Sequence, residues 1–283
     1  MKNRMSRIPP WAMLAVSTVA VAAKPGAETF HYGPDRANIL DVYRPENVKH
    51  APILLFIHGG GWSAGSRSMG EGGQPAYFKG EGYAWVSMGY RMVPKARVED
   101  QAEDVAAAIA WLRNRAEKLH LDPESITLIG HSSGAHLAAL VATDPRWLEK
   151  EHLPISAIKG VISIDGAALD VPGMMAAGAK SSPYYSGAFG VDEARQTSLS
   201  PQAHAATPNA GKWLFLFDGD HNSTSGYFAG SLAAALSNAG AEASVTPIMG
   251  TTHMRMINEL GKPGDEVTEA IDLFLGAKLA PVP

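Results

Sequence analysis

One pentapeptide constrains the fold of this chain more than any other feature. Gly130-His131-Ser132-Ser133-Gly134 lies between the apolar run 125–129 (SITLI) and a stretch of small residues at 134–141. The two flanks predict a strand and a helix, so the pentapeptide lies on the sharp turn that joins them. Such a turn projects the Ser132 hydroxyl above the sheet, and Gly130 and Gly134 leave room for the neighbouring strand and helix. We therefore expect Ser132 to be a nucleophile.

The rest of the chain alternates short apolar runs with longer helical patterns. Strands are expected at 37–44, 52–57, 83–90, 125–129, 158–164, 212–217 and 243–248, and helices at 98–119, 134–141, 227–239 and 267–275. This alternation is typical of an α/β fold with a mostly parallel central sheet and helices on both faces. No linker divides residues 24–283, which we interpret as one domain. The irregular stretch 166–211 is expected to form a small cap over the carboxyl edge of the sheet.

Composition excludes several other classes of protein. The chain has 283 residues, 46% of them hydrophobic, with 24 Lys and Arg against 28 Asp and Glu and no cysteine. The mildly acidic balance, without a basic block, argues against nucleic-acid binding. A chain without cysteine has no thiol nucleophile and no Cys-ligated metal. We expect a small-molecule substrate, and the sequence leaves the oligomeric state open.

The first residues have the layout of a secretory signal peptide. Lys2, Arg4 and Arg7 precede the apolar run 11–23 (WAMLAVSTVAVAA), in which Ala20-Val21-Ala22 offers a small-residue cleavage site. Thirteen residues are too few to span a bilayer, which takes about 20. The pattern predicts export, to the periplasm or outside the cell, without stable membrane insertion. The alternative is an N-terminal helix that stays on a cytoplasmic protein.

A second glycine cluster, His58-Gly59-Gly60-Gly61-Trp62, directly follows a predicted strand. A phosphate-binding loop would need a Lys-Ser/Thr pair, and Ser66-Arg67 stands in that position. A dinucleotide loop would need an acidic residue at the end of the next strand, which has none. Glycines also let successive N–H groups point at one atom, as an oxyanion hole requires. We expect the N–H groups of Gly60, Gly61 and Ser133 to form that hole.

A serine nucleophile needs a base, and histidine has a suitable pKa. His253 follows the last predicted strand, at the sheet edge where a base for Ser132 must lie. His221 and His204 are the alternatives. His136, within the helix after the elbow, is interpreted as a packed residue.

The acid that orients this base is expected after the strand 212–217. Asp218 and Asp220 both follow it, and we favour Asp220, which lies further along the loop. Asp165, after the preceding strand, is a weaker third candidate.

The motifs together resemble the α/β-hydrolase esterases of the BD-FAE-like and hormone-sensitive-lipase-like groups, with a relation to kynurenine formamidases. The matching segments are YGPDRANILDVYRP (32–45), FIHGGGW (56–62), SMGYRMVP (87–94), DPESITLIGHSSGAHLA (122–138) and GTTH (250–253). The resemblance implies a Ser–His–Asp hydrolase that forms an acyl-enzyme on Ser132 without metal or organic cofactor. The family pattern places the acid three residues after a glycine. Counted from Gly219 that position is Asn222, which cannot carry the charge.

The cap is expected to set the substrate. The candidate pocket residues are Trp62, Met174, Met175, Tyr184, Tyr185 and Phe189, any of which could instead cover the core. A short cap suggests short-chain or small aryl or alkyl esters. The alternatives are an arylformamidase-type amide hydrolase, a feruloyl or acetylxylan esterase and, least favoured, a catalytically silent binding protein.

Overall fold

A computed structural model describes residues 24–206 and 208–276 of the chain. The predicted signal segment at 1–23 lies outside these residues. Their strands are β1 Glu28–His31, β2 Ile39–Tyr43, β3 Ala51–Ile57, β4 Ala84–Met88, β5 Leu121–His131, β6 Gly160–Ile164, β7 Lys212–Asp218 and β8 Glu242–Ile248. Their α-helices are α1 Gln74–Gly80, α2 Val98–Arg115, α3 Ser133–Thr143, α4 Arg146–Glu149, α5 Val171–Ala176, α6 Pro183–Phe189, α7 Glu193–Ser198, α8 Pro201–His204, α9 Ser223–Asn238, α10 Arg255–Asn258 and α11 Glu266–Leu275. Short 3-10 helices lie at Arg67–Gly70, Ile155–Ala157 and Ala179–Ser181.

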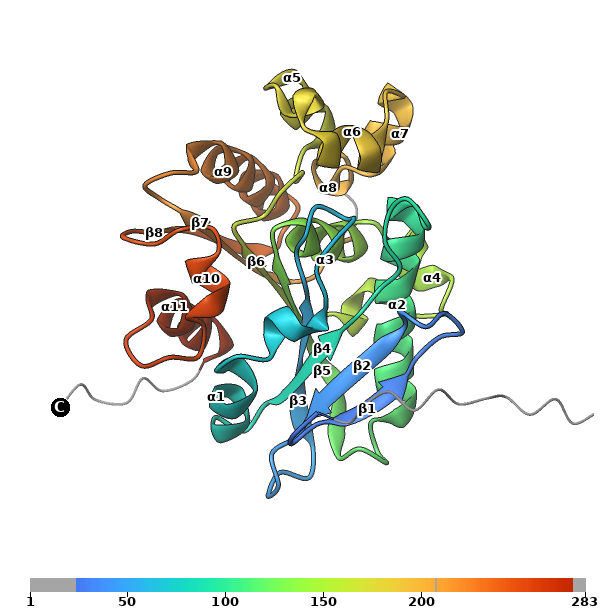
Figure 1. Ribbon diagram of the computed structural model, residues 1–283, viewed down its shortest axis with the longest axis vertical. Coiled ribbons are helices and arrows are strands. Elements are labelled where there is room, and N and C mark those ends of the chain that lie inside the picture. The colour runs from blue at the N-terminus through green and yellow to red at the C-terminus, as the bar shows by residue number, and fades with distance from the viewer. Residues whose placement is uncertain (1–23, 207, 277–283) are drawn as a thin grey trace, which may run out of the picture.

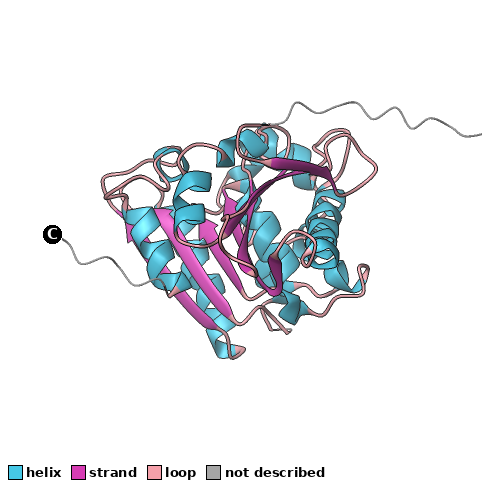
Figure 2. Cartoon of the chain, turned by 90° about the horizontal axis from the view of Figure 1, so that it is seen from below, coloured by secondary structure: helices cyan, strands magenta, loops and turns pink. Residues whose placement is uncertain are grey.

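The strands form one sheet in the order β1-β2-β4-β3-β5-β6-β7-β8. The β1–β2 and β2–β4 pairs are antiparallel, and every pair from β4–β3 to β7–β8 is parallel. The predicted mostly parallel α/β sheet is therefore confirmed, with β1 as an added edge strand. Figure 2 shows the twisted sheet with helices on both faces.

Alternation along the buried strands divides the core into two layers. In β3, Ile53, Leu55 and Ile57 belong to the cluster that contains the apolar residues of α2, α3 and α9. Leu54 and Phe56 belong to the cluster on the other face, with residues of α1, α10 and α11. Because successive strand side chains point to opposite faces, a continuous apolar run is required wherever helices cover both.

Strand register places the site at one edge of the sheet. His131 of β5 is paired with Ile164 of β6, and Ile164 is paired with Leu216 of β7. Residues 132 and 165, the first after their strands, therefore lie on neighbouring strand ends. Helices α5 to α8, all within 166–211, lie beyond this edge (Figure 1). Among the residues described, no helix combines the length and hydrophobicity needed to cross a bilayer.

Candidate active site

Ser132 lies on the predicted turn between β5 and α3. Its backbone has φ 56° and ψ −120°, a conformation that residues other than glycine rarely adopt. A Cβ on Gly130 would lie 2.4 Å from the Gly134 carbonyl oxygen, and one on Gly134 would lie 2.1 Å from that of Ile57. Both glycines are thus required by close backbone contact with the neighbouring helix and strand, for the reason predicted.

The loop after β3 brings a row of N–H groups to the same place. Gly60 and Gly61 have φ values of 126° and 61°, and a Cβ on Gly60 would lie 2.1 Å from the Ala64 carbonyl oxygen. The Gly60 carbonyl accepts the Ala64 N–H at 2.9 Å and so closes the loop. Within the described part of the chain, the N–H groups of Gly60, Gly61 and Ser133 have no hydrogen-bond acceptor. All three residues line one cavity with Ser132.

Trp62 anchors this loop to the core. Its side chain is 1% exposed, and its indole Nε1–H donates to His136 Nδ1 at 3.1 Å. The Trp62 carbonyl accepts from Gln101 Nε2 at 2.7 Å and from the Val93 N–H at 3.0 Å. His136 is packed, as predicted, with Nε2 2.8 Å from the Leu199 carbonyl oxygen. Loop, helix α3 and cap are therefore joined through buried hydrogen bonds.

His253 follows β8 and lies over the ends of β5 and β6. Its carbonyl oxygen is 2.9 Å from His131 Nε2, and the two imidazole rings are 4.5 Å apart. The His253 side chain is 42% exposed and lines the cavity that Ser132 also lines. The connection from β8 therefore carries the imidazole past β7 to the end of β5.

Asp165 is the acidic residue that contacts this imidazole. Its Oδ2 lies 2.5 Å from His253 Nδ1, and its side chain is fully buried at the end of β6. Burial by itself raises the pKa of the Asp165 carboxyl. The hydrogen bonds with His253 and Asn222 outweigh this effect and hold the pKa below its ordinary value of 3.8. Asp165 is therefore a carboxylate at neutral pH.

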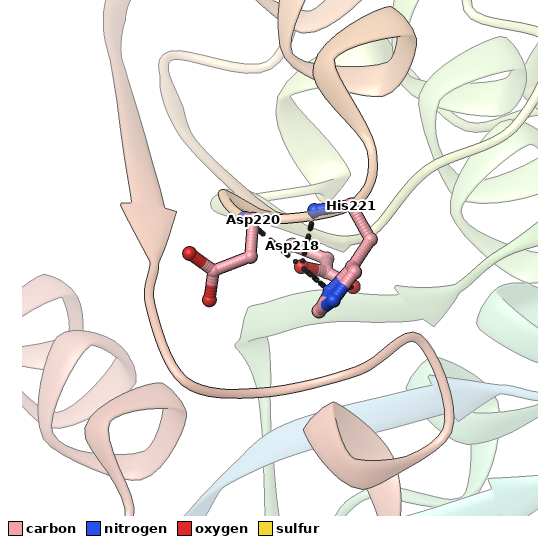
Figure 3. A group of neighbouring side chains, drawn as sticks. All are labelled: Asp218, Asp220 and His221. Atoms are coloured by element: carbon pink, nitrogen blue, oxygen red, sulfur yellow. Dashed lines mark hydrogen bonds and ion pairs between the residues drawn. The ribbon is translucent and has the colours of Figure 1, made fainter.

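The structure corrects the assignment of the acid to Asp220. The Asp220 Oδ2 accepts the Gly250 N–H at 2.6 Å, so this carboxylate binds the loop before His253 and does not contact the imidazole. Asp218 is buried, but its Oδ1 accepts the N–H groups of Asp220 and His221 and lies 3.1 Å from His221 Nδ1 (Figure 3). His253 lies past β7, over the ends of β5 and β6, so the carboxylate beside its imidazole comes from the end of β6. The position of Asp165, one residue beyond a buried strand, was the available signal for it.

The predicted pocket residues divide into two groups. Trp62, Met174, Tyr184 and Tyr185 line the cavity, whose volume is about 470 Å³. Met175 and Phe189 do not line it. Phe189 is fully buried behind Trp62, with ring centroids 4.7 Å apart, and Met175 packs into the core. Lining residues that the sequence did not suggest as pocket residues include Ala64, Met69, Gly166, Ala167, Asn222, Thr224, Ser225 and Met254.

Buried histidines around the site are neutral at physiological pH. Burial lowers the pKa of His58 and His136 to about 4, and burial together with the neighbouring His253 lowers that of His131 to about 4 as well. His131 Nε2 therefore carries the proton and donates to the His253 carbonyl, because a carbonyl can only accept.

In the described part of the chain, one group of side chains has the spacing of metal ligands. It consists of Asp218, Asp220 and His221. The Asp218 carboxylate accepts the N–H groups of Asp220 and His221 and lies 3.1 Å from His221 Nδ1, so it holds the three residues of this loop close together (Figure 3). Asp165 and His253 lie outside this group.

The comparisons with known proteins agree with this geometry. Residues 40–168 match the model of the BD-FAE family, a segment that includes both glycine motifs and Asp165. Esterase LipC of Mycobacterium tuberculosis (strain H37Rv) is 37% identical over 121 residues, which are 41% of this chain and 30% of LipC. Esterase LipQ of the same organism is 35% identical over 115 residues, 39% of this chain and 27% of LipQ. The matched region thus spans less than a third of each of these relatives.

Solved structures match over a longer range. Esterase 2 of Thermogutta terrifontis, in its apo form, has a TM-score of 0.69 at 24% identity and covers 89% of this chain and 92% of its own. Esterase B of Lactobacillus rhamnosis has a TM-score of 0.72 at 21% identity, with 89% and 84% covered. The chain has the α/β-hydrolase fold. The similarity to the BD-FAE family extends over residues 40–168 of it.

Proposed function

We propose that the protein is a serine carboxylesterase that hydrolyses small, uncharged esters through an acyl-enzyme on Ser132. One observation carries the proposal. A strained serine, an imidazole held by a buried carboxylate and three unpaired N–H groups line the same cavity. These are the parts that acyl transfer requires: a nucleophile, a base with an orienting acid, and donors for the developing oxyanion.

The mechanism follows from the role of each group. His253 Nε2 takes the Ser132 proton as the hydroxyl oxygen attacks the ester carbonyl carbon. The Gly60, Gly61 and Ser133 N–H groups stabilise the resulting oxyanion, and the N-terminus of α3 favours the same negative charge. His253 then protonates the leaving alcohol, and water, activated by the same imidazole, releases the acid from Ser132. Asp165 accepts from His253 Nδ1 and so leaves Nε2 free to take the proton.

Ser132 and His253 are poised for this step without being locked together. Within the described residues, no hydrogen bond joins the Ser132 hydroxyl to the imidazole. Such hydrogen bonds are often long in free enzymes and shorten when substrate binds. The proposed cycle therefore includes a small approach of the two side chains on substrate binding.

The cavity wall supports small, uncharged acyl groups. Methionines and aromatic rings make up much of it, with Ser, Thr and Asn as the polar groups. The described lining residues include no Lys, Arg or Glu, so a substrate with a free carboxylate or ammonium group would find no oppositely charged partner beyond the Asp165–His253 pair. N-formylkynurenine, the arylformamidase substrate, carries both groups, and the wall therefore favours esters over it.

Names of the similar proteins point the same way. LipC and LipQ are named esterases, and one structure of the Thermogutta terrifontis esterase 2 contains butyrate. A four-carbon acyl group is of the size that the short cap and the cavity of about 470 Å³ suggest for this chain.

An activity panel on wild type and Ser132→Ala tests the proposal. We expect hydrolysis of p-nitrophenyl acetate and butyrate, weaker hydrolysis of the palmitate, and little activity on N-formylkynurenine. Ser132→Ala is expected to lower kcat by a factor of about 10⁴ or more and to abolish labelling by a fluorophosphonate probe. Ser231→Ala, an exposed serine on α9, serves as the matched control. Full activity in Ser132→Ala would overturn the proposal.

The N-terminal sequence pattern supports export as the location of this activity. A positively charged start, thirteen uncharged and mostly apolar residues and a small-residue site match a cleavable leader. N-terminal sequencing of the protein from cell fractions tests this, and a cytoplasmic product that begins at Met1 would contradict it.

A further inference from the structure

Asn222 reaches the site from the end of β7, whereas Asp165 lies at the end of β6. It lies after β7 and precedes α9, and its Nδ2 donates to Asp165 Oδ1 at 2.9 Å. The other oxygen of that carboxylate, Oδ2, accepts from His253 Nδ1. Each oxygen of the carboxylate therefore has its own side-chain donor, one from the end of β7 and one from the loop after β8.

The orientation of the Asn222 amide is determined by its second hydrogen bond. Its Oδ1 accepts the Ser225 N–H at 3.1 Å and caps α9. Since an asparagine oxygen can only accept and its nitrogen can only donate, the cap leaves Nδ2 to face Asp165. A cap residue at the start of a sixteen-residue helix is also firmly placed, so its amide is a rigid support for the carboxylate.

We propose that Asn222 is a positioning residue of the esterase, which holds the Asp165 carboxylate in the orientation that accepts from His253. This inference rests on the proposed function. Without the Asn222 donor, Asp165 Oδ1 keeps a single hydrogen bond among the described residues, the long one of 3.5 Å from the Asp218 N–H, and the carboxylate can rotate away from the imidazole. Asn222 acts through Asp165 and is assigned no contact with the reacting atoms.

An aspartate at position 222 would separate the two tasks of this side chain. Asp caps a helix as well as Asn does, so Asn222→Asp keeps the acceptor for the Ser225 N–H. It loses the donor to Asp165 and adds a second negative charge beside it. Among the described residues, the titratable side chains that face Asp165 are His253, His131 and Tyr185, and His253 is the one that donates a hydrogen bond to it. A second carboxylate would therefore raise the pKa of Asp165.

Steady-state kinetics of Asn222→Asp across pH test the proposal. We expect kcat to fall about tenfold or more on a p-nitrophenyl ester, with KM little changed, and the acid limb of the kcat profile to move to higher pH. Asn222→Ser, which keeps a capping oxygen without adding charge, should lower kcat without the shift of the acid limb. Asp265→Asn, which exchanges the cap of α11 away from the site, is the matched control and should leave kcat unchanged.

A double-mutant cycle separates positioning from a general disturbance of the loop. In an Asp165→Asn background, Asn222→Asp should cause less than about a twofold further loss, because the group it supports is gone. A full additional loss there, or a wild-type kcat and pH profile in Asn222→Asp, would overturn the proposal. Failure of the proposed function itself shows separately, as activity that survives Ser132→Ala.

Discussion

The loops that follow β6 and β7 are similar at their starts, but the aspartates there have different partners. Each places a buried aspartate at the carboxyl edge of the sheet, Asp165 directly after β6 and Asp218 as the last residue of β7. The Asp165 carboxylate faces His253, which is 88 residues further along the chain. The Asp218 carboxylate faces the N–H groups and the imidazole of its own loop.

The difference shows what determines which groups an aspartate at a strand end binds. The contact of the His253 carbonyl with His131 holds His253 at the end of β5. The loop that leads from β8 to His253 therefore passes over the end of β7. Asp218 satisfies local donors, and Asp165 lies beside the imidazole when it arrives. The path of the loop that carries the imidazole therefore determines which strand-end carboxylate contacts it. This path is a property of the tertiary structure.

Exchange of the acid for an amide gives the largest expected effect. Asp165→Asn should lower kcat by about 10⁴, because an amide cannot hold the imidazole with Nδ1 protonated and Nε2 free. Asp218→Asn should stay within about threefold of wild type. Both are measured on a p-nitrophenyl ester with purified, folded protein. If Asp218→Asn showed the large loss of kcat and Asp165→Asn the small one, the acid would belong to β7 and the comparison of the two loops would be wrong.

The pH dependence of stability should be steepest where the buried histidines titrate. The pKa of His131 is about 4 in the folded protein and about 6.5 when unfolded, so the unfolded chain binds more protons between these values. Stability then rises with pH across this window and is lost as pH falls from about 6.5 towards 4. Each such histidine contributes at most about 1.4 kcal/mol per pH unit.

Denaturant unfolding between pH 4.5 and 7 measures this slope. His131→Gln keeps a side-chain donor for the His253 carbonyl and removes the titrating group, so the slope should decrease. His136→Gln should decrease it by a similar amount, since burial lowers the pKa of His136 to about 4 as well. An unchanged slope in both variants would show that these imidazoles are not kept neutral by burial.

We expect Asp218 to contribute mainly to the stability of the fold, whereas we expect Asp165 to contribute mainly to activity. Asp218→Ala removes the acceptor of two backbone N–H groups and one imidazole, and we expect a loss of about 1–2 kcal/mol in the free energy of unfolding. Water can reach part of this exposed loop, which keeps the loss small. Asp218→Asn retains one acceptor oxygen and should lose less. Thermal and denaturant midpoints give the values, and an unchanged midpoint in Asp218→Ala would contradict the structural role.

The elbow could be predicted from the sequence because its constraints are local. Gly130, Ser132 and Gly134 lie within five residues, and contacts of 2.4 Å and 2.1 Å that a side chain would make explain both glycines. The presence of His253 at the site could be predicted as well, since His253 follows the last strand of a regular strand–helix pattern. The acid could not, because three aspartates follow neighbouring strands and only the path of the β8 loop distinguishes them.

The candidate pocket residues within 166–211 show the same limit of prediction from sequence. Their residue type and place in the predicted cap made Met174 and Met175 candidates to line the pocket or to cover the core, but adjacent residues on a helix point in different directions. Met174 lines the cavity, and Met175 packs into the core. Tyr184, 56% exposed, and Phe189, fully buried, differ in the same way. Residue type predicted an apolar wall, and only the tertiary structure shows which side chains form it.

The smallest expected effect concerns Asp220, which the sequence favoured as the acid, in place of Asp165, which contacts the imidazole of His253. Asp220 holds the Gly250 N–H at an exposed position, and an exposed hydrogen bond contributes about 0.5–1.5 kcal/mol. The loop of His253 keeps other supports, among them the His131 contact with the His253 carbonyl and the Arg255 contact with the Gly250 carbonyl. Asp220→Ala should therefore lower kcat/KM by less than about fivefold, and Asp220→Asn, which keeps an acceptor, by less still. A loss near 10⁴ in Asp220→Ala would make Asp220 the partner of the base during turnover, and the contrast between the two loops would then describe only the resting enzyme.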